Sequence, residues 1–385
     1  MRLRAFKVKN FRSIKDTDWQ NFSPDNITAL IGQNEAGKTS ILEALYSFPT
    51  AEISEDVLRD DGSMPEVSCS FEVSWDEVKE LFKEKVLPKG LAKIISDKKR
   101  INLTRTWKDA ETEGDLSLEE QELSAIFKPT ESEATDKPTN EQSPKTDTVP
   151  VEQKEPIKEV TEEEFINAIF DKSPEFEFFE DFASLLPDTI DLEDLQNKNT
   201  KAEGYKGAEN LLAIAGLDLS FLQTKERRII ENHIGELNKN VTTDFQEFWR
   251  QKIGKTNKIA LEFELKHHTK EETAKAGKPY LVFWIKDGQK KLYPKQRSKG
   301  VRWFTSFYLQ LKASSLDKSK HDQIFLIDEP GGSLHARAQE DVLKVFEEIK
   351  SNVQVIYTTH SPYLIKLETI YRLLAVQRAD EEDDK

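Results

Sequence analysis

A phosphate-binding loop of the pattern G-x-x-x-x-G-K-[ST] is present near the N-terminus, as Gly32-Gln33-Asn34-Glu35-Ala36-Gly37-Lys38-Thr39. It follows Asn26–Ile31, an apolar run that predicts a buried strand, and opens Lys38–Phe48, whose apolar spacing predicts a helix. Glycines let main-chain N–H groups converge on phosphate oxygens, and the helix N-terminus adds partial positive charge. We therefore predict ATP as the ligand, with Lys38 at the β- and γ-phosphates and Thr39 ligating Mg²⁺. An ordinary glycine turn is the alternative, which the strand-loop-helix context disfavours.

Two acidic residues follow a second apolar run. Ile324–Ile327 predicts a buried strand and is followed by Asp328-Glu329-Pro330. At the carboxyl end of this strand, Asp328 suits the Mg²⁺ site and Glu329 suits polarisation of an attacking water. A turn capped by acids is the alternative and is common. Together with the loop, the pair favours hydrolysis of ATP, with Glu329 as the catalytic carboxylate.

A third buried strand is predicted over Val353–Thr358 and leads to His360-Ser361-Pro362. A histidine at this position can hydrogen-bond the γ-phosphate or orient the nucleophilic water. We expect His360 to join Lys38 and Glu329 as a catalytic residue. A capping histidine without catalytic function would be favoured if the motif stood alone.

The string Arg297-Ser298-Lys299-Gly300 precedes a predicted helix over Val301–Leu311. A serine N-cap with exposed amides forms an anion site, so Ser298, Lys299 and Gly300 are candidate nucleotide-binding residues. In isolation the string would be an ordinary helix start. Its position shortly before the Asp328-Glu329 strand favours the functional interpretation.

The remaining elements divide the chain into segments. Alternation predicts strands over residues 2–9, 67–74, 100–108, 259–266 and 280–286, and helical spacing predicts helices over 76–86, 222–249 and 334–349. From about 128 to 160 large apolar residues almost vanish, which predicts disorder. We expect the following segments: 1–127, the N-terminal part of an ATPase head; 128–160, a disordered acidic insertion; 161–257, a helical insertion; 258–377, the C-terminal part of the head; and 378–385, an acidic tail.

The formal net charge is −15, but it is unevenly distributed. Residues 109–164 carry 18 acidic side chains and 5 lysines, so the rest of the chain is close to neutral and DNA stays open as a partner. Cys69 is the one cysteine, which rules out an intrachain disulfide and favours the reducing cytoplasm. The sequence contains no apolar run of membrane-spanning length and no signal peptide, so no membrane association is expected.

In this order, the four motifs resemble the ATP-binding-cassette (ABC) head shared by RecF, SMC-type proteins and the overcoming-lysogenisation-defect (OLD) family, and the OLD-type ATPase domain is the closest likeness. The fold implied is an α/β P-loop NTPase, with an N-terminal antiparallel β lobe and a helical insertion. The resemblance adds Arg12 and Ser40 to the nucleotide-binding residues. The matching runs are Asn10-Phe11-Arg12-Ser13, Gly32–Thr39, Arg297–Gly300 with Trp303, Phe304, Phe307 and Tyr308, Asp328–Pro330, Ser333-Leu334-His335 and Thr358–Pro362.

This resemblance implies a head-to-head homodimer, or a higher even oligomer, with two ATPs between protomers. Ser298–Gly300 would contact the γ-phosphate held by the other chain, and Ser333–His335 would run beside the interface. Arg-Ser-Lys-Gly replaces the Leu-Ser-Gly-Gly of transporters, which disfavours a transporter ATPase. OLD nucleases continue into a Toprim nuclease domain, whereas 20 residues follow Ile365 here. We therefore expect that the nuclease or effector is on a separate protein, or that it has been removed from this chain.

Two functions remain open. The first is the ATPase component of an anti-phage defence or DNA-maintenance system, which works with nucleic acid. The second is an ATP-dependent scaffold that holds or releases a protein partner without binding DNA. Salt-dependent binding to duplex DNA would favour the first, and partner capture without DNA would favour the second.

Overall fold

The computed structural model describes residues 1–127, 159–179, 181–182, 184–224, 226–250, 258–269, 275–316 and 322–377. The chain folds as two compact units, each built from two segments. Unit 1 comprises Met1–Asn21 and Thr50–Pro174, and unit 2 comprises Phe22–Pro49 and Glu175–Lys385. Among the helices in the described parts of the chain, none combines the length and apolar character needed to cross a membrane.

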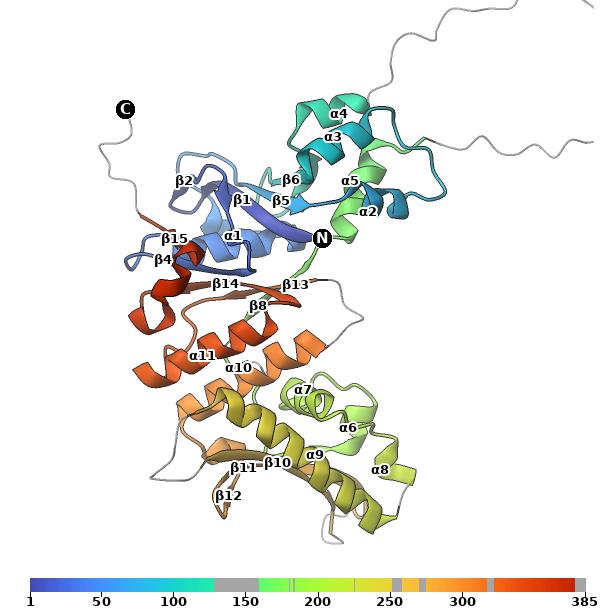
Figure 1. Ribbon diagram of the computed structural model, residues 1–385, viewed down its shortest axis with the longest axis vertical. Coiled ribbons are helices and arrows are strands. Elements are labelled where there is room, and N and C mark those ends of the chain that lie inside the picture. Colours follow the sequence, from blue (N-terminus) through green and yellow to red (C-terminus); the bar gives the residue numbers. More distant parts are fainter. Residues whose placement is uncertain are drawn as a thin grey trace, which may run out of the picture. The chain divides into compact units, whose positions relative to one another are not determined.

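An antiparallel sheet forms the centre of unit 1, with the order β2-β1-β5-β6-β7 and with β3 paired to β1 outside this path (Figure 1). In β1, Phe6 and Val8 are buried while Lys7 and Lys9 are partly exposed, so alternation places one face in the core. The predicted N-terminal β lobe is thereby confirmed. The strands are β1 (Arg2–Phe11), β2 (Ile14–Asp16), β3 (Gln20–Asn21), β5 (Glu66–Glu72), β6 (Arg100–Thr106) and β7 (Asp115–Leu118).

Short helices complete unit 1. Two of them begin with reciprocal capping boxes, Ser74 with Glu77 and Thr161 with Glu164, which satisfy amides that a helix start leaves unpaired. These helical elements are η1 (Glu55–Val57), α2 (Trp75–Leu81), α3 (Leu91–Lys98), α4 (Gln121–Ile126) and α5 (Glu162–Asp171).

A parallel sheet with the order β15-β4-β14-β13-β8 forms one half of unit 2. Every residue of β13 and of β14 is buried, which explains their continuous apolar runs, because both faces of a parallel sheet are covered. Ile31 pairs with Thr359, and Ile327 pairs with Tyr357, so the carboxyl ends of these strands meet at one edge. The strands are β4 (Ile27–Ile31), β8 (Glu175–Phe179), β13 (Gln323–Ile327), β14 (Val353–Thr359) and β15 (Leu373–Ala375).

Helices α10 and α11 pack together and lie between this sheet and a second, antiparallel sheet of unit 2 (Figure 1). One continuous apolar core runs through unit 2 and includes Trp303, Phe304 and Phe307 of α10. The helices are α1 (Lys38–Thr50), α6 (Leu192–Gln196), α7 (Tyr205–Ala215), α8 (Phe221–Thr224), α9 (Arg227–Phe248), α10 (Lys299–Leu316) and α11 (Ala336–Ile349), with single turns η2 (Pro294–Gln296), η3 (Pro362–Leu364) and η4 (Leu367–Arg372). The second sheet contains β9 (Thr189–Asp191), β10 (Ile259–His267), β11 (Pro279–Asp287) and β12 (Lys290–Leu292).

Several predicted elements differ from the structure in extent. The helix predicted over 76–86 ends at Leu81, and the helix predicted over 222–249 is divided between α8 and α9. The segment predicted as a helical insertion, 161–257, contributes β8 to the parallel sheet, because Glu175–Phe179 pairs with β13 along its whole length. The predicted disordered insertion lies outside the described residues except at Glu159 and Val160, and Val160 is 3% exposed.

Candidate functional site

The loop between β4 and α1 turns back over its own lysine. Glu35 and Gly37 have positive φ values of 63° and 97°, which bend the main chain around the start of α1. Lys38 is 6% exposed, and its ammonium group donates to the carbonyl oxygens of Gly32 (3.1 Å) and Gln33 (2.9 Å). Two neutral carbonyl oxygens of the loop therefore accept hydrogen bonds from the charged lysine.

The exposed side of the loop carries polar side chains. Gln33, Asn34 and Glu35 are exposed, while Ala36 and Ser40 are partly buried. This exposure leaves the tip of the loop accessible to a ligand.

Asp328 lies beside Thr39 at the edge where the parallel strands end. The Thr39 hydroxyl is 3.1 Å from both carboxylate oxygens of Asp328. The Thr358 hydroxyl, at the end of β14, donates to the same carboxylate at 2.5 Å. One hydroxyl and one carboxylate in contact are oxygen donors of the kind that Mg²⁺ takes from proteins. These residues therefore fit the predicted metal.

The Glu329 carboxylate lies between Lys38 and His360. One of its oxygens is 3.9 Å from the Lys38 ammonium nitrogen, and the other is 2.8 Å from His360 Nδ1. The Glu329 main chain has φ 43°, a strained conformation for a residue with a side chain, and its N–H donates to the Thr358 hydroxyl at 2.9 Å. Thr358 thus positions both acids, and His360 is 63% exposed at the outer side of Glu329.

Gln339 bridges the two loops that carry Glu329 and His360, and no sequence pattern singled it out. Its Nε2 donates to the Gly331 carbonyl at 3.1 Å, and its Oε1 accepts from the Ser361 hydroxyl at 2.6 Å. Gly331 has φ 73°, so its carbonyl direction depends on a conformation that glycine favours. We call these two hydrogen bonds the Gln339 bridge.

The predicted Arg297–Gly300 segment is built into unit 2 away from Lys38. The Arg297 guanidinium donates twice to the Ile285 carbonyl (3.0 and 2.7 Å), and burial lowers its pKa. The Ser298 carbonyl accepts from Arg302 N–H at 3.0 Å at the start of α10. Within the described residues, no hydrogen bond or ion pair joins Ser298 or Lys299 to the loop of the same chain.

Gly300 lies against the loop that follows the two acids. A Cβ added at Gly300 would be 3.2 Å from the Leu334 side chain and 3.3 Å from the Ser333 carbonyl oxygen. These two segments, separate in sequence, therefore share one surface of unit 2.

Arg12 belongs to unit 1, whereas the loop and the acids belong to unit 2. Its N–H donates to the Val57 carbonyl at 2.9 Å, and its guanidinium pairs with Asp56 at 2.5 Å. Arg12 also has a positive φ of 52°. The structure therefore gives Arg12 a partner within its own unit.

An ion cluster holds β15 beside β4. Arg372 is 6% exposed and pairs with Asp25 (2.9 Å) and Glu347 (2.6 Å). The hydrogen bond from Arg372 lowers the pKa of Glu347 to about 2. Burial opposes ionisation of Asp25, but hydrogen bonds from Arg372 and Ser23 outweigh it and lower the pKa. The cluster joins the residues preceding β4, α11 and β15.

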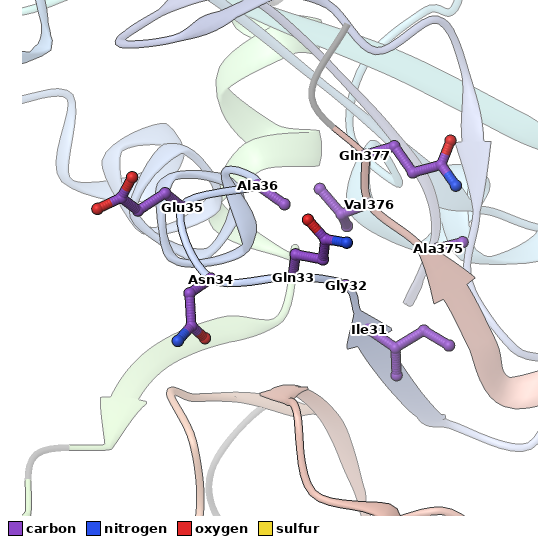
Figure 2. A pocket seen from close by; sticks show the side chains of 9 residues that line it. All are labelled: Ile31, Gly32, Gln33, Asn34, Glu35, Ala36, Ala375, Val376 and Gln377. Carbon is purple, nitrogen blue, oxygen red and sulfur yellow. The ribbon is translucent and has the colours of Figure 1, made fainter.

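A hollow of about 590 Å³ opens beside the loop, on the side of β15 (Figure 2). Its walls come from the last residue of β4, the loop, the last residue of β15 and the two residues that follow β15. They are Ile31, Gly32, Gln33, Asn34, Glu35, Ala36, Ala375, Val376 and Gln377.

Comparison with known proteins places this geometry in a family. The model of the AAA ATPase domain family matches residues 1–365. Over 85 residues the chain is 32% identical to the uncharacterized protein MJECL43 of Methanocaldococcus jannaschii, a match that spans 22% of this chain and 22% of that protein.

Three solved structures of SMC heads align with this chain. A head bound to the C-winged helix domain of ScpA aligns over 99% of this chain and 96% of its own, with TM-score 0.51 and 13% identity. The Pyrococcus furiosus head with an extended coiled coil, bound to the C-terminal domain of ScpA, aligns over 98% and 94%, with TM-score 0.46 and 17% identity. The Thermotoga maritima head aligns over 99% and 96%, with TM-score 0.43 and 12% identity. The first of these similarities confirms the predicted α/β head fold.

Proposed function

Because this chain belongs to the family of AAA ATPase domains, we propose that it is an ATP-driven switch that binds MgATP on Gly32–Thr39 and hydrolyses it with Glu329. One observation carries the proposal. Residues from two distant parts of the sequence meet at one edge of the parallel sheet. The Thr39 hydroxyl is 3.1 Å from the Asp328 carboxylate, and the Lys38 ammonium nitrogen is 3.9 Å from the Glu329 carboxylate.

Phosphate binding follows from the state of Lys38. Its ammonium group now donates to two neutral carbonyl oxygens. Charged phosphate oxygens are stronger acceptors, because charge-assisted hydrogen bonds are about twice as strong as neutral ones. ATP would therefore draw the lysine away from Gly32 and Gln33, and the loop amides would hold the β-phosphate.

The metal would be held by Thr39 and Asp328. When bound, Mg²⁺ neutralises negative charge on the β- and γ-phosphate oxygens. The Thr358 hydroxyl keeps the Asp328 carboxylate in place by its hydrogen bond of 2.5 Å. Phosphate release that requires added Mg²⁺ and stops with EDTA tests this assignment.

The Glu329 carboxylate is the group that can polarise water. One oxygen faces Lys38, where the terminal phosphate would bind, and the other is held by His360. A water next to Glu329 would lie in line with that phosphate and lose its proton toward the carboxylate. His360 keeps the carboxylate oriented and supplies a donor toward the phosphate.

Hydrolysis in this scheme takes place in a head-to-head dimer. In support, Ser298 and Lys299 make no hydrogen bond or ion pair to the loop of their own chain among the described residues, and Gly300 packs on Ser333–Leu334. In a two-fold dimer the same surface occurs on both protomers, so each Ser298–Gly300 segment would reach the nucleotide of the other. An ATP-dependent doubling of mass in light scattering tests this step.

The biological setting we propose is an OLD-type ATPase component of anti-phage defence or DNA maintenance, acting with a separate nuclease or effector. This part rests on family analogy. Binding to duplex DNA that weakens steeply with salt would support it.

A protein scaffold is the second candidate, and an exposed apolar segment favours it. Tyr363, Leu367, Ile370 and Tyr371 are 47%, 82%, 64% and 55% exposed, shortly after His360. Apolar side chains gathered on a surface mark protein-binding sites. ATP-dependent capture of a purified effector, with no affinity for DNA at low salt, would favour this candidate over the first.

A further inference from the structure

Another hollow, of about 390 Å³, lies on the antiparallel sheet of unit 1 and takes no part in the ATP chemistry. We call it the unit 1 hollow. Its volume falls within the usual range of small-molecule pockets, about 300–1,000 Å³. All of its lining residues belong to unit 1, whereas the phosphate-binding loop and the two acids belong to unit 2. It is therefore a candidate binding site for a different molecule.

A row of short side chains forms the floor of the unit 1 hollow. Ala5 of β1 pairs with Ser70 of β5, and Ser70 pairs with Asn102 of β6, so the three side chains lie on one face of the sheet. Trp19, which precedes β3, lines the end next to β1. Because Ala5 and Ser70 are small, they leave space between the Trp19 ring and the end of the hollow at Asn102.

Two buried oxygen atoms at the β6 end lack hydrogen-bond donors. They are Asn102 Oδ1 and Glu120 Oε2, and neither has a partner among the described residues. Glu120 is the N-cap residue of α4, but its side chain does not cap that helix. Burial raises the pKa of the Glu120 carboxyl group, and Lys98 and the main-chain N–H of Asn102 oppose this rise only in part. Buried acceptors generally have a donor, so this end suits a ligand that donates hydrogen bonds.

Two cationic side chains, Lys98 and Arg100, line the same end of the hollow. Lys98 ends α3, and Arg100 begins β6 two residues before Asn102. Both are exposed, and their partners hold them weakly. The Lys98 ammonium nitrogen is 3.5 Å from the exposed carboxylate of Glu122, and the Arg100 guanidinium donates to the Asn21 side-chain oxygen at 3.3 Å. Exposed ion pairs stabilise a protein little, so both cations can turn to an anionic group of a ligand.

We propose that the unit 1 hollow binds a free α-amino acid with an apolar side chain. The ammonium group, which has three donors, contacts the two unpaired oxygens of Asn102 and Glu120. The carboxylate, on the same carbon, accepts from Lys98 and Arg100, and the apolar side chain lies over the short floor toward Trp19. A metal ion fits less well, because in the part of the chain that the structure describes no group of three or more His, Cys, Asp or Glu side chains is placed to hold one.

Calorimetry on the wild-type chain, without ATP, tests the proposal with probes that differ only in charge. L-phenylalanine carries both charged groups, phenethylamine lacks the carboxylate, and 3-phenylpropionate lacks the ammonium group. L-phenylalanine should bind with a Kd of about 1 mM or tighter, and each analogue at least about tenfold more weakly, because each loses one set of charged contacts. L-leucine is titrated in parallel as a smaller apolar side chain. If neither amino acid binds at about 10 mM, or if an analogue binds as well as L-phenylalanine, the proposal is wrong.

Variants then assign the two charges of the ligand to their partners. Glu120→Gln keeps the size of the side chain and removes its charge, so it should weaken L-phenylalanine at least about tenfold and leave 3-phenylpropionate unchanged. Glu119→Gln removes the same charge one residue earlier, outside the hollow, and should change affinity less than about twofold. Wild-type affinity for L-phenylalanine in the Glu120→Gln protein would overturn the proposal.

Lys98→Met guards the test against misfolding, because Lys98 is exposed. This variant should weaken L-phenylalanine and bind phenethylamine as the wild type does. If Lys98→Met weakens both probes equally, the predicted position of the carboxylate is wrong, and the proposal falls. None of these titrations contains ATP, so their failure leaves the proposed ATPase function standing.

Discussion

Replacing Gln339 by Leu should reduce turnover more than it reduces nucleotide affinity. The substitution removes the bond to the Gly331 carbonyl (3.1 Å) and the bond from the Ser361 hydroxyl (2.6 Å). Each neutral hydrogen bond contributes about 1 kcal/mol net, so the Gln339 bridge contributes ~2 kcal/mol to holding the Glu329 and His360 loops together. If this whole amount is needed for alignment in the transition state, kcat falls about 30-fold.

The assay is steady-state phosphate release, with the melting temperature measured in parallel. Gln246→Leu is a matched control, because Gln246 donates an equivalent bond to the Ile259 carbonyl at 2.8 Å, outside the loops of the site. Gln246→Leu should lower stability and leave kcat unchanged. Gln339→Glu, which still accepts from Ser361, should restore part of kcat. The reasoning is refuted if Gln339→Leu loses stability as the control does and keeps wild-type kcat.

Three further outcomes are expected. Lys38→Ala should abolish detectable ATP binding in calorimetry, and wild-type affinity would exclude the phosphate-loop assignment. Ser298→Arg should bind ATP without hydrolysing it. Mixing this variant with Lys38→Ala should restore part of the ATPase activity, because one shared site would then have an intact loop and an intact Ser298 segment. If both variants fold and dimerise but the mixture has no ATPase activity, the site is not shared between chains. Arg372→Met should lower stability at neutral pH by about 3 kcal/mol, because two partly buried carboxylates lose the guanidinium and only Lys350 remains as a cation beside them among the described residues. The folded-state pKa values of Glu347 and Asp25 are lowered, so the stabilisation by Arg372 is complete above the unfolded-state pKa of these carboxyl groups. In chemical denaturation, the difference in unfolding free energy between wild type and variant should therefore shrink as pH falls from about 5 toward 2. A difference that does not change with pH would contradict this prediction.

The motifs at strand ends could be placed from the sequence because their signals are local. An apolar run ending at Asp328 predicts a buried strand, and parallel strands present their carboxyl ends at one edge. The contacts of Asp328 with Thr39 and Thr358 follow from that rule. Which carboxylate oxygen faces which partner depends on side-chain contacts between residues far apart in the sequence, and the sequence does not show it.

Other parts of the site depend on contacts that leave no local pattern. β15 has three residues, and its place beside β4 comes from the pairing of Ala375 with Ile31 and from the Arg372 cluster. The hollow beside the loop exists only because of that pairing. Gln339 is one polar residue in an amphipathic helix, and its role depends on the turn at Gly331. β8 lies in a segment predicted as a helical insertion. Its acidic and aromatic residues alternate over Glu175–Phe178, but such a short run does not show that it joins the parallel sheet, and pairing with β13 decides its structure.

The central claim is that Glu329 polarises the water that attacks ATP, and Glu329→Gln tests it most directly. The substitution keeps the size of the side chain and removes its charge. Single-turnover measurements on the variant, with ATP affinity determined by calorimetry, should show ATP bound with near wild-type affinity and cleaved about 10²–10⁴-fold more slowly. Cleavage at the wild-type rate by a folded, ATP-binding Glu329→Gln protein would contradict the account.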